Sequence, residues 1–346
     1  LGADVRIETG FGTSIKLADD AYDAAGATVF SDLASALDGA DMVLRLNPPT
    51  DEEVSPLSPG TVHVSYVDPF NDTDLVQKLA DQKVSALCME LIPRTTIAQK
   101  MDALSSQANL AGYVVVLMAV NALDKILPMM MTPAGTLSPA RVFIVGAGVA
   151  GLQAIATAKR LGGRVEAFDT RPVVEEQVQS LGARFLKVDL GDTGQTEGGY
   201  AKQLTEEQID KQRQAMAKAC AQADIVITTA QVFGRQAPRI VTEEMIKGMK
   251  PGSVVLDMAV DSGGNVAGSK PEEVVDVNGV KILGYSNLAR RVPVDASQMY
   301  ASNLFNLIEH FWDADAKAFS LNREDEIISG ALLTHDGAVV NEMIKE

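Results

Sequence analysis

The sequence predicts an α/β protein of two Rossmann-like, doubly wound parallel-sheet domains, joined by long helices with a cleft between them. Three observations support this fold class. Short apolar runs alternate with helical patterns, which indicates parallel sheets covered on both faces. One apolar run ends in a glycine-rich turn that leads straight into a helix. The 346 residues are enough for two large α/β domains.

The glycine-rich turn has the spacing G-x-G-x-x-G, formed by Gly146, Gly148 and Gly151. The first glycine lets the chain turn sharply off the strand, the second leaves room for a pyrophosphate, and the third lets the helix lie close to the sheet. Phosphates would then meet the free N–H groups at the start of the helix. Val149 and Ala150 therefore join the glycines as candidate cofactor-binding residues. A tight turn without a ligand is the alternative.

An acidic residue follows the next apolar run, at Asp169. Its distance from Gly151 is close to the ~20 residues expected for the acid that binds the adenosine ribose. A carboxylate accepts hydrogen bonds from a free 2′-hydroxyl and repels a 2′-phosphate. The sequence therefore predicts NAD(H) rather than NADP(H), although Arg171 could pair with a 2′-phosphate.

Composition limits the partners. The net charge of −16 argues against nucleic acid and against anionic membrane surfaces. Apolar runs such as 113–120 are too short to span a bilayer, so no direct membrane insertion is expected. Cys88 and Cys220 lie in apolar or helical surroundings, which favours reduced thiols and a cytoplasmic location. No metal site is expected, because no metal-ligand spacing occurs and the histidines stand alone at positions 63, 310 and 335.

The expected domains are discontinuous. Residues 1–112 with 312–346 form an N-terminal α/β domain, and residues 128–297 form the NAD-binding domain. Helices over 103–127 and 296–311 link the two. The chain begins at Leu1 rather than Met, and we expect an N-terminal piece to precede it.

The patterns also place individual elements. Strands are expected at 1–8, 27–30, 40–46, 60–67, 83–89, 141–145, 164–168, 184–188, 224–229, 253–258 and 280–284. Helices are expected at 19–25, 33–37, 72–80, 105–127, 150–160, 173–181, 205–221 and 295–311. Residues 128–138 are expected to be a linker, and residues 327–340 a hairpin about His335-Asp336-Gly337.

Three polar stretches are candidates for ligand contact. Gln99, Asp102, Ser106 and Asn109 recur at helical spacing, which predicts either a polar stripe lining a cleft or a solvated helix face. The glycine-rich segment 190–200 is a candidate mobile loop. Residues 260–265 form a second glycine turn at the end of a strand, where open sheets bind ligands.

Taken together, these motifs resemble the alanine dehydrogenase and proton-translocating transhydrogenase superfamily, and within it the NAD(H)-binding domain of transhydrogenase. The resemblance covers nearly the whole chain. The segments that carry it are 93–94, 102–107, 109–113, 146–152, 168–171, 198–202, 257–259 and 263–265.

The resemblance implies hydride transfer between NADH on this chain and NADP+ on a partner domain. It assigns nicotinamide contacts and catalytic roles to Arg94, Gln99, Asp102 and Ser105, and a closing lid to Tyr200. It also implies a transmembrane proton-channel domain on another chain, a homodimer, and a cytoplasmic location peripheral to the inner membrane. The remaining cofactor-binding residues that it implies are Thr95, Thr96, Thr170, Arg171, Gly199, Thr229, Ala230 and Gln231.

Some residues depart from this pattern. Tyr66 stands where alanine dehydrogenases have a catalytic His, and His63 should point to the opposite face of its strand. Asp261 matches the second catalytic acid of those enzymes. Val114 and Gln231 replace a usual Arg and a usual aliphatic residue. An alanine dehydrogenase-type enzyme and a non-catalytic NAD-binding module therefore stay as alternatives.

Overall fold

The computed structural model describes residues 1–191, 204–231 and 234–345. The chain forms two compact units. Unit 1 comprises Leu1–Gln107 and Pro293–Glu346, and unit 2 comprises Ala108–Val292. The 18-residue helix α10 (Pro293–His310) therefore falls within unit 1, where 296–311 was expected to link the domains. The predicted residues Gly199 and Tyr200 lie outside the described residues.

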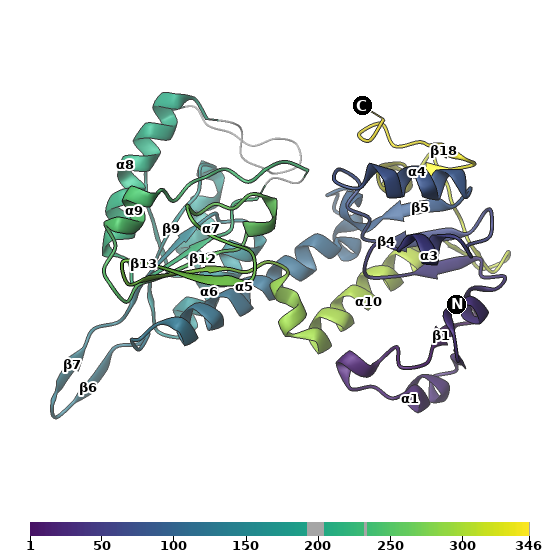
Figure 1. Cartoon of the computed structure of the whole chain (residues 1–346), viewed down its shortest axis with the longest axis horizontal. Helices are drawn as coiled ribbons and strands as arrows, with labels where there is room; N and C mark the ends of the chain where they lie inside the picture. The colour runs from purple at the N-terminus through teal and green to yellow at the C-terminus, as the bar shows by residue number, and fades with distance from the viewer. Residues whose placement is uncertain (192–203, 232–233, 346) are drawn as a thin grey trace. The chain divides into compact units, whose positions relative to one another are not determined.

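Unit 2 is built on a seven-stranded sheet (Figure 1). Its strand order is β10-β9-β8-β11-β12-β14-β13, parallel throughout except that β13 runs antiparallel to β14. From β8 the chain proceeds to one side through β9 and β10, then returns to the other side of β8 at β11. This reversal is the topological switch point of a Rossmann-type sheet. The strands are β8 (Arg141–Val145), β9 (Arg164–Phe168), β10 (Arg184–Phe185), β11 (Ile225–Thr228), β12 (Val254–Asp257), β13 (Glu273–Val277) and β14 (Val280–Gly284).

Helices cover both faces of this sheet (Figure 1). Val142 and Ile144 of β8 face a core shared with α5 and α6, whereas Phe143 and Val145 face a core shared with α8 and α9. This alternation is the two-residue period of a strand, and every second residue is apolar on each side because both faces are buried. The helices are α5 (Ala103–Ala122), α6 (Val149–Arg160), α7 (Glu175–Ser180), α8 (Glu206–Gln222) and α9 (Glu243–Lys247).

Unit 1 contains a smaller parallel sheet in the order β3-β4-β5. Its three strands are β3 (Met42–Leu44), β4 (Val62–Ser65) and β5 (Ser85–Cys88). A separate parallel pair joins β1 (Arg6–Glu8) to β2 (Thr28–Phe30). Val64 and Leu87 pack in one core with Leu307 of α10 and Ile328 of α11. The helices are α1 (Asp19–Ala24), α2 (Leu33–Leu37), α3 (Asp51–Val54), α4 (Thr73–Asp81), α10 and α11 (Glu326–Ala331).

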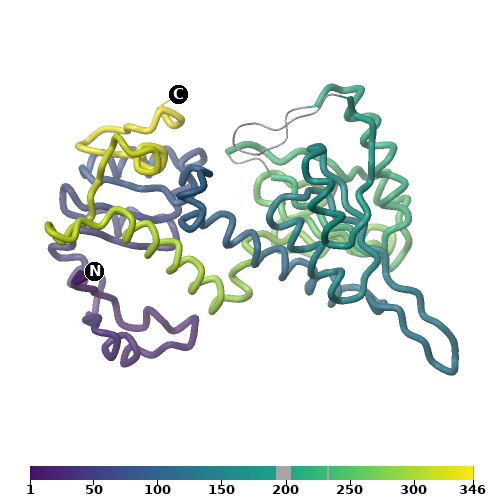
Figure 2. The backbone as a smooth tube through the Cα atoms, turned by 180° about the vertical axis from the view of Figure 1, so that it is seen from behind, coloured from purple at the N-terminus to yellow at the C-terminus, as the bar shows by residue number. Residues whose placement is uncertain are grey.

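The C-terminal segment packs into unit 1, beside strands formed by the start of the chain (Figure 2). The buried hydroxyl of Thr334 donates to the carbonyl of Val84 at 2.7 Å, and the amide of Ala86 donates to that hydroxyl at 3.2 Å. Its short strands are β15 (Trp312–Asp313), β16 (Ala318–Phe319), β17 (Thr334–His335) and β18 (Ala338–Val339).

The tail is only partly the predicted hairpin. β17 and β18 do pair antiparallel about Asp336 and Gly337, which have the positive φ of 49° and 83° that such a turn requires. Residues 327–331 are wrong as strand, because they belong to α11. The carboxylate of Asp325 caps that helix by accepting from the amide of Ile327 at 2.8 Å.

The long helix α5 ends at Ala122 rather than at the predicted Leu127. The ammonium of Lys281 donates to the Ala122 carbonyl at 2.9 Å, so a side chain from β14 satisfies a group at the helix end. Among the described residues α5 is long and apolar enough to cross a membrane, which the count of uninterrupted apolar residues did not indicate. Val115, Val116 and Ala119 of this helix are buried in the core of unit 2.

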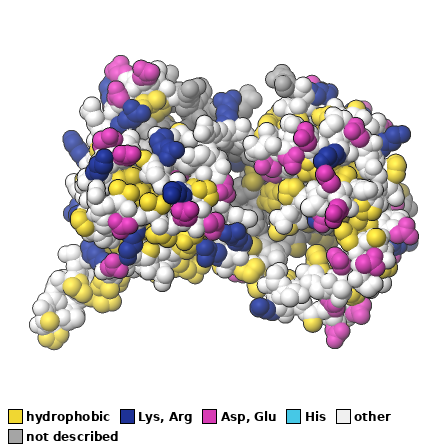
Figure 3. Space-filling model, viewed as in Figure 1, with side chains coloured by type: hydrophobic (Ala, Val, Ile, Leu, Met, Phe, Trp, Pro, Cys, Tyr) yellow, Lys and Arg dark blue, Asp and Glu magenta, His cyan; other side chains and the backbone are white. Residues whose placement is uncertain are grey.

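The expected linker 128–138 contains a hairpin, β6 (Met130–Thr132) paired with β7 (Gly135–Leu137). It projects from its own sheet, with hydrophobic side chains on its surface (Figure 3). The sequence analysis also missed α9 and β13. The Asn278-Gly279 pair, with φ of 55° and 81°, is the turn signal that would have revealed the β13–β14 hairpin.

Candidate functional site

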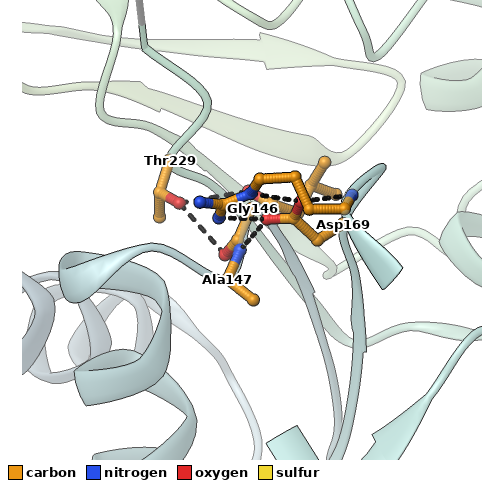
Figure 4. A network of polar contacts seen from close by, with 6 residues as sticks. Gly146, Ala147, Asp169 and Thr229 are labelled. Atoms are coloured by element: carbon orange, nitrogen blue, oxygen red, sulfur yellow. Dashed lines mark hydrogen bonds and ion pairs between the residues drawn. The ribbon is translucent and has the colours of Figure 1, made fainter. Parts of the chain in front are cut away.

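The glycine turn lies at the switch point, where β8 passes into α6 (Figure 4). Gly146 has a φ of 98°, a conformation that favours glycine. Its amide donates to the carbonyl of Phe168 at 2.8 Å, which ties the turn to the end of β9. A side chain at Gly146 would begin 2.5 Å from the hydroxyl oxygen of Thr229, at the end of β11. Three neighbouring strand ends therefore meet around one small residue.

The start of α6 is left open toward a ligand. Gly148 is the N-cap residue, and no side chain accepts a hydrogen bond from the first turn of the helix. A Cβ at Gly148 would meet no atom within 4 Å. The main-chain N–H groups of a first helical turn have no partners within the helix, and together with the helix dipole they bind anions. These residues therefore fit the diphosphate of a dinucleotide.

Close packing holds α6 in place. A Cβ at Gly151 would lie 1.9 Å from the carbonyl oxygen of Gly146, so only glycine lets the helix lie against the turn. A Cβ at Gly112, on α5, would lie 2.2 Å from the carbonyl oxygen of Ala150. Gly112 is thus a further part of the site's framework. Sequence reasoning did not assign it a role, because its requirement comes from the approach of a helix distant in the chain.

Asp169 follows β9 and connects to the glycine turn (Figure 4). The amide of Ala147 donates to its carboxylate at 2.7 Å. Arg171 adds its main-chain amide at 2.9 Å and its guanidinium at 2.9 and 2.8 Å. The side chains are 7% exposed for Asp169 and 16% for Arg171. Hydrogen bonding to the carboxylate raises the pKa of the Arg171 guanidinium.

The loop after β11 carries Thr229, Ala230 and Gln231 to the same end of the sheet. The Thr229 hydroxyl donates to the carbonyls of Val145 and Gly146 at 3.3 and 3.2 Å. The exposed Gln231 donates its amide to the carbonyl of Met258 at 3.0 Å. The structure therefore brings these residues together with the glycine turn. Asp169, Thr170 and Arg171 reach the same end of the sheet from β9.

The second glycine turn is organised by a buried carboxylate. Asp257, at the end of β12, accepts from the amides of Ala259, Asn265 and Val266 at 3.0 to 3.2 Å. The amide nitrogen of Asn265 donates to the carbonyl of Ala230 at 2.9 Å. This turn therefore fixes the loop after β11. Asp257 was missed because its role depends on contacts with later residues in the turn.

The predicted nicotinamide residues lie in unit 1. Gln99 is on a short 3-10 turn, η3 (Ala98–Met101), and α5 starts only after Asp102. The expected polar stripe on one helix is therefore wrong, because the chain is extended at Asp102. The carboxylate of Asp102 caps α5 by accepting from the amide and the hydroxyl of Ser105, at 2.9 and 2.6 Å. Arg94, Thr96 and Gln99 are exposed, whereas Thr95, Asp102 and Ser105 are half-buried.

The aromatic residue at the alanine dehydrogenase histidine position packs inside unit 1. Tyr66 stacks on Tyr300 with ring centroids 5.5 Å apart, and burial raises the pKa of the Tyr66 phenol. His63 lies on the other face of β4, fully buried, with neither ring nitrogen hydrogen-bonded. Burial lowers the pKa of His63 to about 4, with a further effect of the Arg45 charge.

The described residues contain no group of three or more His, Cys, Asp or Glu side chains that could hold a metal ion. Cys88 and Cys220 are buried free thiols, and burial raises the pKa of Cys220 to about 12. The Sγ of Cys88 donates to the Glu90 carboxylate at 2.8 Å. A hollow of about 410 Å³ beside α8 and α9, lined by Arg213, Thr242 and Met245 among others, includes none of the predicted site residues.

The switch-point glycines, the uncapped helix and the acid after the second strand define a dinucleotide-binding protein. Comparison with known proteins makes the assignment more specific. Residues 1–111 match the N-terminal domain model of alanine dehydrogenase/PNT, and residues 115–342 match the C-terminal domain model. The chain belongs to the alanine dehydrogenase/PNT family, which implies that its cofactor is NAD(H).

Relatives within the family distinguish its two branches. The chain is 46% identical to the first portion of the NAD(P) transhydrogenase alpha subunit of Rhodospirillum rubrum, over 99% of this chain and 91% of the relative. A crystal structure of transhydrogenase from Sinorhizobium meliloti superposes with a TM-score of 0.85 at 42% identity, covering 99% of this chain and 91% of the other. An L-alanine dehydrogenase shares the fold, with a TM-score of 0.80 at 23% identity and coverage of 99% and 90%. These findings support a transhydrogenase component.

Proposed function

We propose that this chain is the NAD(H)-binding component of a Re/Si-specific, proton-translocating transhydrogenase. Its reaction is hydride transfer between NADH on this chain and NADP+ on a partner domain. The observation that carries the proposal is the open N-terminus of α6 beside Asp169, in a chain 46% identical to a transhydrogenase alpha subunit.

Unit 2 binds the adenosine and diphosphate part of the cofactor. Gly148 leaves space for the diphosphate, and the amides of Val149, Ala150 and Gly151 are positioned to donate to it. Asp169 faces the ribose hydroxyls. The other residues that we assign to this part of the site are Gly146, Thr170, Arg171, Thr229, Ala230 and Gln231.

Unit 1 supplies the residues for the nicotinamide end. Bound NAD(H) supplies the hydride, which passes from carbon to carbon, so these residues need no acid–base role. Their task is to orient the carboxamide and hold the ring in reach of its acceptor. The nicotinamide contacts that we propose are Arg94, Thr95, Thr96, Gln99, Asp102 and Ser105, with Gly199 and Tyr200 closing over the cofactor.

The partners follow from this assignment. An NADP(H)-binding domain and a transmembrane proton-channel domain on other chains complete the enzyme, with this chain at the cytoplasmic face of the inner membrane. We also propose a homodimer. The exposed side chains of Met130, Met131 and Leu137 on the β6–β7 hairpin support a protein contact there, because exposed apolar groups clustered on one element favour association.

Mixing tests the proposal. The purified chain, combined with a transhydrogenase NADP(H)-binding domain, is expected to transfer hydride from NADH to an NADP+ analogue, followed by absorbance. The control is NAD+ with L-alanine and no partner, where no reduction is expected. Alanine-dependent reduction would instead support an alanine dehydrogenase. NADH binding without exchange would support a non-catalytic module.

A further inference from the structure

The adenosine acid of this site is already paired with a cation. Two nitrogens of the Arg171 guanidinium, Nε and one terminal nitrogen, donate to different oxygens of Asp169, at 2.9 and 2.8 Å. Such two-point contacts between arginine and carboxylate are among the stronger hydrogen bonds in proteins. Both side chains are at most 16% exposed, so water weakens the pair only slightly.

The hydrogen bonds that the carboxylate accepts fill its lone-pair positions. A carboxylate has about four such positions. The amides of Ala147 and Arg171 use two of them, and the guanidinium uses the other two. A ribose hydroxyl needs one position, and the guanidinium can yield one by side-chain rotation, whereas the amides are fixed by the main chain.

The pair is also electrically neutral as a unit. A lone carboxylate would repel a 2′-phosphate by its charge alone, but the adjacent guanidinium offsets most of that repulsion. Rejection of NADP(H) must therefore come from how the guanidinium is held. To reach a 2′-phosphate, Arg171 would have to leave Asp169, and a nearly buried carboxylate would then face a phosphate dianion without its cation.

We propose that Arg171 decides nucleotide choice: held by Asp169 it keeps the site selective for NAD(H), and released from Asp169 it binds the 2′-phosphate of NADP(H). This inference rests on the proposed cofactor site and adds the residue that sets its selectivity. Arginine suits the second role because its planar donor array matches phosphate oxygens. Asp169 and Arg171 then act as one selectivity element.

Fluorescence titration with NADH and with NADPH tests the inference on the full chain. Asp169→Ser removes the carboxylate and is expected to weaken NADH binding and strengthen NADPH binding, each by about tenfold or more, since charge-assisted hydrogen bonds are lost and gained. The double variant Asp169→Ser, Arg171→Gln is expected to lose the gain in NADPH affinity. Its NADH affinity should match that of the single variant.

Two further measurements keep the outcome clear. Far-UV circular dichroism checks folding, and Asp169→Asn, which keeps the side-chain shape, replaces Asp169→Ser if that variant unfolds. A wild-type chain that binds neither nucleotide contradicts the proposed function itself. A wild-type chain that binds NADH, with no NADPH gain in the single variants or with a gain that survives Arg171→Gln, overturns the role of Arg171 alone.

Discussion

Gly146 and Gly151 are in contact across the turn, so close that a Cβ on Gly151 would lie 1.9 Å from the carbonyl oxygen of Gly146. This contact sets how near α6 begins to the end of β8. It also aims the first turn of the helix across the switch point of the sheet. The position of the proposed diphosphate site is therefore fixed by the absence of one side chain.

Gly151→Ala is expected to destabilise the protein by about 1–3 kcal/mol, because the methyl group must displace main-chain atoms rather than a flexible side chain. Thermal unfolding followed by circular dichroism measures the effect. An unchanged midpoint would contradict the packing described for α6.

Gly148→Ala is the matched opposite case. Its Cβ would meet nothing within 4 Å and its φ of −79° suits any residue, so stability should change by less than about 1 kcal/mol. The methyl group would stand in the space proposed for the diphosphate. NADH affinity, measured by titration, is expected to fall about tenfold or more. Unchanged affinity would remove the start of α6 from the cofactor site.

His63 should make the protein sensitive to acid. Burial lowers its pKa from 6.5 to about 4, so between these values the unfolded chain binds a proton that the folded chain does not. The free energy of unfolding should therefore fall as pH decreases through this range, by up to ~1.4 kcal/mol per pH unit. Urea unfolding at several pH values measures the slope.

His63→Leu serves as the comparison for that experiment, because leucine cannot take up a proton. Its unfolding free energy should depend less steeply on pH between 6.5 and 4 than that of the wild type. The same slope in both proteins would show that other groups, such as Arg45 and Glu53 nearby, govern the acid response.

Asp102 combines a structural contact with a proposed role in hydride transfer. Asp102→Ala removes the cap of α5 and should cost about 1 kcal/mol of stability. Asp102→Asn keeps an acceptor for the Ser105 amide, so its unfolding midpoint should stay near that of the wild type. Slow hydride transfer in the Asn variant, assayed with the NADP(H)-binding domain, would separate the proposed role from capping. Equal rates would exclude it.

Asp257→Ala is expected to destabilise the protein by about 3 kcal/mol or more, because three buried amides lose their acceptor at once. The exposed Asp261, in the same turn, gives the control: Asp261→Ala should change stability by less than about 0.5 kcal/mol. Denaturant unfolding compares the two. Equal losses would mean that Asp257 does not organise the second glycine turn.

The sequence predicted the elements whose signals are local. The parallel strands and α8 were expected close to their observed bounds, because long apolar or amphipathic runs have a clear period. The short α9 and the edge strand β13 were not, since five residues show too little periodicity. The hairpin β6–β7 was missed because methionines before a proline suggested a linker.

By itself, the sequence determined the α/β class, the glycine turn and the acid that follows it, because each depends on residues adjacent in the chain. Only the tertiary structure decided that Arg171 is held by Asp169, that Gly112 lies against Ala150, and that Asp257 fixes the loop after β11. Those relationships depend on which side chains rotate toward one another after the strands have been ordered. Spacing along the chain contains no information about that rotation.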